Sequence, residues 1–222
     1  MKKLFEKFTL YDIIVIAMMA ALGIAVKQVI QPLVQVVTGP LFIPGGTVAG
    51  GIYMLFIVLG YAIVRKRFTA LLVCLVQAVI VMATGLFGTH GAASLVTYIL
   101  PGIGVEILFF FTRIRATSNK PLTAGECFAG GIAANGIGSV ASSFVFFNLP
   151  LIPLLLVFFT GALSGGLGGL LAFALAKQAD RFRPAGEEPD ADIDIDIDQE
   201  PDEGGTDGKA AADGDDRKDL PD

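Results

Sequence analysis

Six long apolar segments, separated by short polar or charged turns, make up most of this chain. They are residues 11–30, 46–64, 69–86, 92–112, 123–147 and 151–178. Each is close to the roughly 20 residues that a helix needs to cross the hydrocarbon core of a bilayer. Unpaired backbone groups are costly in lipid, so we predict an all-α bundle of six transmembrane helices.

The basic residues between these segments predict the orientation of the helices. The turns midway between basic clusters, at 31–45, 85–91 and 147–150, contain no Lys, Arg, Asp or Glu. Because cationic loops stay on the cytoplasmic side of a membrane, we predict that both termini are cytoplasmic. The basic clusters are Lys2, Lys3 and Lys7; Arg65, Lys66 and Arg67; Arg113, Arg115 and Lys120; and Lys177, Arg181 and Arg183.

Composition separates the chain into two parts. A hydrophobic fraction of 54% and a mean hydropathy of +0.69 exclude an ordinary soluble domain. Residues 184–222 hold 16 of the 21 acidic residues but only three basic ones. We therefore predict a six-helix domain over residues 1–183 and a disordered acidic cytoplasmic tail over 184–222. Without a basic groove that has interleaved aromatics, we expect no nucleic-acid partner.

The first uncharged connection, Gln31 to Gly45, is long, mostly apolar and contains three prolines. It is expected either to fold back against the bundle as a lid or to extend a neighbouring helix. The segment Ile13 to Val26 is predicted to be a retained first helix rather than a cleaved signal peptide. The two cysteines, Cys74 and Cys127, are predicted to be small buried hydrophobes.

The chain lacks the residue groups that catalysis within a membrane would require. The stretch Gly161 to Gly165 reads Gly-Ala-Leu-Ser-Gly, one residue longer than a serine-protease motif. The only histidine, His90, is in a predicted outer loop. Clustered metal ligands and a Gly-rich phosphate loop are also missing. We predict that the protein is not an enzyme and has no catalytic residue, metal or cofactor.

Polar residues within the apolar segments suggest a binding site instead, because they are costly to bury in lipid. Asn135 and Ser139 share one helix face, and Gln77, Tyr98 and His90 lie toward the same outer end. We predict that these five residues bind a substrate in a neutral pocket, with Tyr98 stacking on a flat ring. Hydrogen bonding between helices is an equally strong alternative for Asn135 and Gln77, and the stronger one for Ser139.

Two isolated charges and an alanine strip complete the candidates. Lys27 is expected to extend its ammonium to the outer interface rather than to bind a ligand. Glu106 is expected to have a structural or coupling role, because it must face the bundle, pair or be protonated. Ala17, Ala21 and Ala25 form a smooth strip that predicts contact with a neighbouring helix or a separate subunit.

Small residues spaced by four predict close packing of the last two helices. Such ridges let backbones approach one another, which is how helices gain contact area inside a membrane. We assign the ridges to packing and to no other function. They are Gly130, Ala134 and Gly138 in the fifth segment, and Gly161, Gly165 and Gly169 in the sixth.

These features together resemble the substrate-binding S component of an energy-coupling factor (ECF) transporter. The shared features are six helices with both ends inside, the strip from Ala17 to Ala21, a Pro-rich first outer loop and the absence of an ATPase motif. The region from Gly50 to Arg115 is most similar to the YkoE-type proteins. The similar stretches are Gly51-Ile52-Tyr53, Tyr61 to Lys66, Gly85, and Gly104-Val105-Glu106 leading to Thr112-Arg113.

The resemblance implies a function and a set of partners. It implies a multi-pass protein of the bacterial cytoplasmic membrane that captures a vitamin or precursor, of the thiamine or hydroxymethylpyrimidine kind, from outside. It also implies a T component that contacts Ala17, Ala21 and Ala25, and two ABC ATPase subunits. The chain departs from the YkoE pattern by lacking acidic residues in the third helix and by its acidic tail. The neutral pocket favours an uncharged pyrimidine-like ring over a cation.

Two alternatives to this assignment remain at the level of the sequence. One is a stand-alone transporter or channel for small solutes that needs no ATPase partner. The other is a membrane scaffold that transports nothing and recruits a cytoplasmic protein through its acidic tail. The three hypotheses differ in whether ATPase partners bind the chain and in whether the tail is needed.

Overall fold

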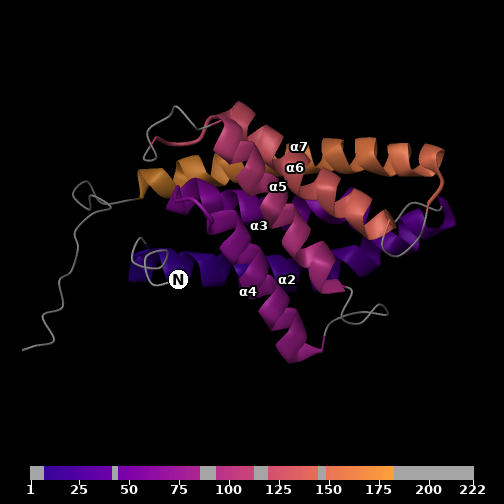
Figure 1. Ribbon diagram of the computed structural model, residues 1–222, viewed down its shortest axis with the longest axis horizontal. Helices are drawn as coiled ribbons and strands as arrows, with labels where there is room; N and C mark the ends of the chain where they lie inside the picture. The colour runs from indigo at the N-terminus through magenta and orange to yellow at the C-terminus, as the bar shows by residue number, and fades with distance from the viewer. Residues whose placement is uncertain (1–7, 42–44, 86–93, 113–119, 145–148, 183–222) are drawn as a thin grey trace, which may run out of the picture. The chain divides into compact units, whose positions relative to one another are not determined.

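The computed structural model describes residues 8–41, 45–85, 94–112, 120–144 and 149–182 (Figure 1). Within these ranges the chain forms six α-helices and one short 3-10 helix, which confirms the all-α prediction. Each helix begins within about two residues of its predicted start. The elements are α2 (Leu10–Thr38), η1 (Gly39–Leu41), α3 (Gly45–Val64), α4 (Thr69–Thr84), α5 (Ser94–Thr112), α6 (Ala124–Ser142) and α7 (Leu151–Arg181).

Of the two expectations for Gln31 to Gly45, a lid or an extension of a neighbouring helix, the structure shows the helical extension as far as Thr38. Helix α2 runs through Pro32 and ends at Thr38, so its 29 residues extend over about 43 Å. A helix satisfies the backbone groups of this apolar stretch internally, which a folded-back loop would not. In the last turn of α2, the Gln35 side chain accepts a hydrogen bond of 2.6 Å from the Gly45 backbone N–H at the start of α3.

Four helices are long and apolar enough to cross a membrane, as judged by length and composition within the described residues. They are α2, α3, α7 and the segment Leu95–Thr112 of α5. Helix α4 is also apolar but has only 16 residues. Helix α6 is rich in glycine and alanine and packs against α3, α5 and α7. The prediction of six crossings is thus supported for four helices and stays a prediction for the other two.

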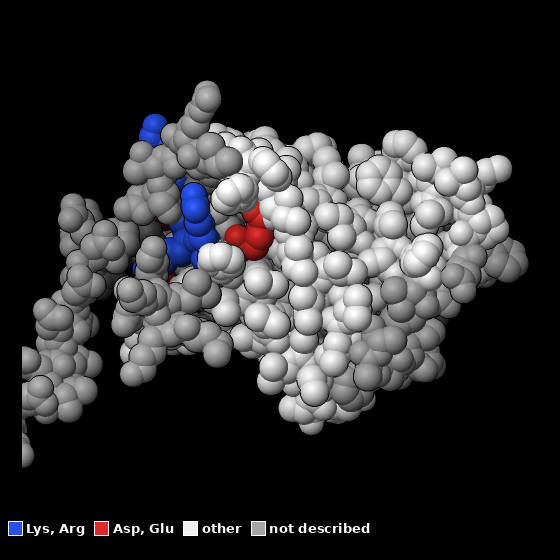
Figure 2. Space-filling view, viewed as in Figure 1, with Lys and Arg blue, Asp and Glu red and all other residues white. Residues whose placement is uncertain are grey.

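One end of the bundle carries the described basic residues other than Lys27. There the turn after α3 pairs with both the first and the last helix: Lys66 lies 2.8 Å from Asp12 of α2, and Arg65 pairs with Asp180 of α7. The start of α2 and the end of α7 therefore lie at the same end (Figure 1). Figure 2 shows the visible Lys and Arg gathered at that end. That this basic end faces the cytoplasm remains a prediction.

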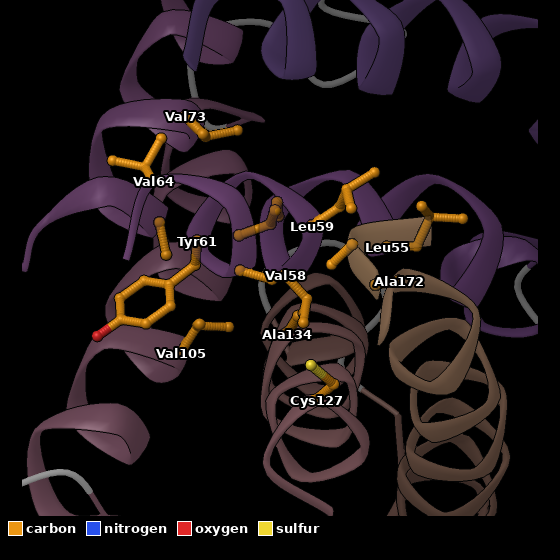
Figure 3. Packing of buried hydrophobic residues seen from close by; sticks show 14 of the residues in the cluster. Leu55, Val58, Leu59, Tyr61, Val64, Val73, Val105, Cys127, Ala134 and Ala172 are labelled. Atoms are coloured by element: carbon orange, nitrogen blue, oxygen red, sulfur yellow. The ribbon is translucent and has the colours of Figure 1, made fainter. Parts of the chain in front are cut away.

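Helix α3 forms the centre of the hydrophobic core (Figure 3). Its side chains Leu55, Val58 and Leu59 are almost completely buried, and Tyr61 stacks on Phe109 of α5 with ring centroids 4.3 Å apart. The same cluster includes residues of α2, α4, α6 and α7. Both cysteines are buried in it, which confirms their assignment as small buried residues.

Glycines bring the backbones of α3, α6 and α7 into direct contact. A Cβ atom placed on Gly131 of α6 would lie 2.0 Å from the carbonyl oxygen of Gly165 in α7. A Cβ on Gly168 of α7 would lie 2.0 Å from the carbonyl oxygen of Gly51 in α3. No side chain fits between backbones at this separation, so these three helices form one tightly packed block, which we call the glycine block.

Candidate functional site

Asn135 of α6 joins three helices of the glycine block. Its side chain is buried, and its amide nitrogen donates hydrogen bonds to the carbonyl oxygens of Thr47 in α3 (3.0 Å) and Gly161 in α7 (2.8 Å). The hydroxyl of Ser139, one turn further along α6, donates to the side-chain amide oxygen of Asn135 at 3.4 Å. Bonds to α3 and α7 therefore account for the Asn135 amide nitrogen, as the packing alternative expects, whereas the Ser139 hydroxyl bonds within α6. A role of either residue in substrate binding stays a prediction.

Ser164 of α7 is a second connection in the glycine block, and the sequence analysis did not select it. Its hydroxyl donates to the carbonyl oxygen of Val48 at 2.5 Å and accepts a bond of 3.1 Å from the Gly51 backbone N–H. Both partners are in the first two turns of α3. One feature of the sequence could have indicated it: Ser164 lies beside Gly165 in an apolar helix, where a hydroxyl needs a hydrogen-bond partner.

A second polar cluster lies where α2, α3 and α5 meet, and we call it the lysine–tyrosine cluster. The ammonium nitrogen of Lys27 lies 3.9 Å from the ring centroid of Tyr98 and 5.5 Å from that of Tyr53. Lys27 is half-buried, whereas both tyrosines are buried. The expectation that Lys27 extends to the outer interface is wrong, because two ring faces attract the ammonium inward.

The tyrosines of this cluster are fixed by the helices that carry them. The Tyr53 hydroxyl donates a hydrogen bond of 2.7 Å to the carbonyl oxygen of Gly46, in the first turn of α3. Tyr98 packs with Ile24 of α2 and with Ala78 of α4 in a small apolar cluster. The predicted stacking surface of Tyr98 is therefore present, but Lys27 lies over one of its faces.

Gln77 of α4 lies next to the lysine–tyrosine cluster. Its side chain is buried, and its amide nitrogen would be 2.4 Å from a Cβ placed on Gly23 of α2. Gly23 is one helical turn before Lys27, so Gln77 and Tyr98 contact adjacent positions on one face of α2. Gln77 and Tyr98 are thus brought together, whereas Asn135 and Ser139 belong to the glycine block. His90 lies outside the described residues.

The alanine strip faces away from the bundle. Ala17, Ala21 and Ala25 are all exposed, whereas the neighbouring Ala20 and Ile24 of α2 are buried. The sequence left open whether this strip meets a helix of the same bundle or a separate subunit. In this structure no helix of the described bundle covers it, so lipid or another protein must.

Glu106 of α5 caps the start of α4. Its carboxylate accepts a hydrogen bond of 2.8 Å from the backbone N–H of Ala70. The residue before α4, Phe68, has a φ of 70° and provides no side-chain cap of its own. A carboxylate is favourable there, because the first N–H groups of a helix lack partners and carry partial positive charge. This contact is a structural role for Glu106.

Replacing Glu106 with alanine is expected to lower the free energy of unfolding by about 1–2 kcal/mol, because the first turn of α4 loses its acceptor. Glu106→Gln keeps an acceptor oxygen and should lose less. Thermal unfolding of the purified variants in detergent measures both changes. Equal stability of wild type and Glu106→Ala, combined with a loss of transport, would point to a coupling role instead.

A cavity of about 260 Å³ opens at the basic end, between α3, α6 and α7. Arg65, Lys177 and Asp180 contribute its charged groups, and the rest of its wall is mostly apolar. Arg65 is 12 residues, or about 18 Å along α3, from Tyr53. This cavity is therefore separate from the lysine–tyrosine cluster. No group of three or more His, Cys, Asp or Glu within the described ranges is placed to hold a metal ion.

The apolar helices within the described ranges are those of a multi-pass membrane protein. The family described as "ABC-type cobalt transport system, permease component" matches residues 11–132, and the chain belongs to this family. This is a family of transport permeases rather than enzymes. No curated protein matches the chain.

Among solved structures, one described as "Crystal structure of an S-component of ECF transporter" has a similar fold. Its TM-score is 0.64, with 21% sequence identity over 78% of this chain and 86% of that chain. The helical fold expected from the resemblance to S components is therefore confirmed. The similarity to YkoE-type proteins and the vitamin-like substrate stay predictions.

Proposed function

We propose that this protein is the substrate-binding S component of an ECF-type importer in the cytoplasmic membrane of a bacterium. It captures a vitamin or vitamin precursor, of the thiamine or hydroxymethylpyrimidine kind, from outside the cell. A T component and two ABC ATPase subunits then drive uptake. The observation that carries the proposal is the exposed alanine strip of α2 in a fold of the S-component type.

The strip supports a protein partner because of its shape and position. Ala17, Ala21 and Ala25 recur every fourth residue, so they align along one side of α2 and let a second helix approach closely. An adjoining face of the same helix, which includes Ala20 and Ile24, is already buried in the bundle. Helix α2 can therefore contact a T component without giving up its internal packing.

Cobalt is a second candidate substrate, because the description of the matching family names it. A Co²⁺ site would use imidazole, thiolate or carboxylate ligands. The described residues provide no such group of three, and the lysine–tyrosine cluster carries a positive charge. These observations favour an organic substrate, and the ligand experiments below include Co²⁺ for this reason.

Replacing Ala21 with tryptophan is expected to abolish co-purification with the T component and the ATPases. The indole ring would hold a neighbouring helix away from the α2 backbone, because it fills the space that the alanines leave open. Co-expression of the tagged chain with its partners, followed by affinity purification, measures the loss. Leu163→Trp is the control: this exposed residue of α7 accepts a ring without touching α2.

The same experiment separates the alternatives. If the wild-type protein transports its substrate but pulls down no ATPase partner, it is a stand-alone transporter. That result contradicts the proposal. A scaffold that acts through its tail should lose its function when residues 184–222 are deleted, whereas uptake by an S component should persist. Retention of partners by Ala21→Trp would exclude the alanine strip as their contact.

A further inference from the structure

We propose that Lys27 determines the charge of the ligand: the lysine–tyrosine cluster accepts a neutral or anionic ring compound and rejects organic cations and divalent metal ions. This inference rests on the proposed function. It takes the substrate to bind at this cluster, where the predicted substrate-binding residues Gln77 and Tyr98 lie. It goes further by naming a specificity residue and the chemical class that this residue selects.

The first argument is the position of the ammonium group. Two tyrosine rings from α3 and α5 are the groups that would bind a cationic ligand, because ring faces attract positive charge. In this protein the nitrogen of Lys27 is already 3.9 Å from the Tyr98 centroid and 5.5 Å from the Tyr53 centroid. A second cation would have to displace Lys27 or remain next to a like charge.

The second argument is that no described carboxylate neutralises Lys27. Each of the four described acidic residues is engaged by another partner: Asp12 by Lys66, Glu106 by Ala70, Glu126 by Thr123, and Asp180 by Arg65. None of them forms an ion pair with Lys27. On α2, Asp12 lies 15 residues away, or about 22 Å along the helix axis. The charge of the cluster is therefore positive.

The third argument is the hydrogen-bonding chemistry around the ammonium. Lys27 has three N–H donors and no acceptor. The side-chain amide of Gln77 in α4 lies against Gly23, which is one turn before Lys27 on the same face of α2. A ligand with ring nitrogens, a carbonyl or a carboxylate can accept from Lys27 while its ring lies against Tyr98. Hydroxymethylpyrimidine has such ring nitrogens and no fixed charge, whereas thiamine adds a cationic thiazolium to the same pyrimidine.

These two compounds and Co²⁺ form a matched set of probes for the intact protein, purified in detergent. Isothermal titration should show that hydroxymethylpyrimidine binds wild type at least 10-fold more tightly than thiamine does, and that Co²⁺ does not bind. In Lys27→Met, which keeps the length of the side chain, this ratio should fall at least 10-fold. Lys27→Arg keeps the charge and should keep the preference.

Three results would overturn the inference: tighter binding of thiamine or Co²⁺ than of hydroxymethylpyrimidine by wild type, no binding of any probe, or an unchanged ratio in Lys27→Met. The wild-type measurements remain decisive if Lys27→Met fails to fold. Co-purification of wild type with a T component and ATPases reports on the proposed function independently. If the chain co-purifies with its partners but prefers thiamine, the role of Lys27 is refuted and the proposed function is not.

Discussion

Replacing Gly131 with alanine is expected to lower the free energy of unfolding by about 3 kcal/mol, or to prevent folding. The added Cβ atom would lie 2.0 Å from the Gly165 carbonyl oxygen and 2.9 Å from the Gly169 nitrogen. Both are backbone atoms of α7, so no side chain can rotate away and the two helices must separate. Thermal unfolding in detergent, together with the fraction recovered as monodisperse protein, measures the effect.

Gly125 provides a matched control on the same helix. A Cβ atom at this position would meet nothing within 4 Å. Gly125→Ala should therefore be neutral or slightly stabilising, because alanine favours helix over glycine by up to about 1 kcal/mol. Equal stability of the two variants would show that α6 and α7 are not in backbone contact at Gly131.

The second large effect is expected for Asn135→Leu, which should lower the free energy of unfolding by about 2 kcal/mol. The substitution removes two hydrogen bonds that link α6 to α3 and α7, and bonds between membrane helices contribute roughly 0.6–1.7 kcal/mol each. The loss of the Ser139 partner adds to the cost. Unfolding in a denaturing detergent titration gives the difference from wild type.

Ser142→Ala is the control for this variant, because among the described residues the Ser142 hydroxyl donates to the Gly138 carbonyl of its own helix and links no second helix. Its stability should stay within about 0.5 kcal/mol of wild type. Asn135→Leu also tests whether Asn135 contacts a substrate. Unchanged hydroxymethylpyrimidine affinity in the folded fraction would assign it to packing, and a loss of affinity greater than 10-fold would restore it to the binding site.

Much of the fold was predictable because membrane helices have a strong sequence pattern. Long apolar runs predicted all six described helices. The basic clusters correctly indicated that the turn after α3 and the end of α7 lie at the same end, where Arg65 pairs with Asp180. The extension of α2 beyond Gln31 could not be decided, because Pro32 is compatible with either a turn or a continuing helix. Its outcome depends on packing against the start of α3, which the sequence does not display.

The candidate site was only partly predictable. Gln77 and Tyr98 were selected as buried polar groups, and they do lie close to one another beside α2. Lys27 was misjudged because a lysine near a helix end can extend outward or inward, and the choice depends on which rings lie nearby. Tyr53 was not selected at all, because its position across from Lys27 follows from the packing of α3 on α2.

The ridges of small residues show the same limit. The glycines of α7 were expected to pack closely, and Gly165 and Gly169 do approach α6. However, they approach it at Gly131 and Cys127, whereas Gly130 faces Phe109 of α5. The spacing of glycines therefore predicted that close contacts occur, but not which faces of the two helices meet.

The glycine block has a consequence for how a solute would enter and leave. Because its helices touch through backbone atoms, it has no layer of compressible side chains and should respond to force as a single rigid piece. Of the lysine–tyrosine cluster, only Tyr53 is anchored in that piece, while Lys27 and Tyr98 belong to α2 and α5. In the proposed transporter, opening and closing around a substrate at this cluster is then expected to come from shear of α2 and α5 across the glycine block.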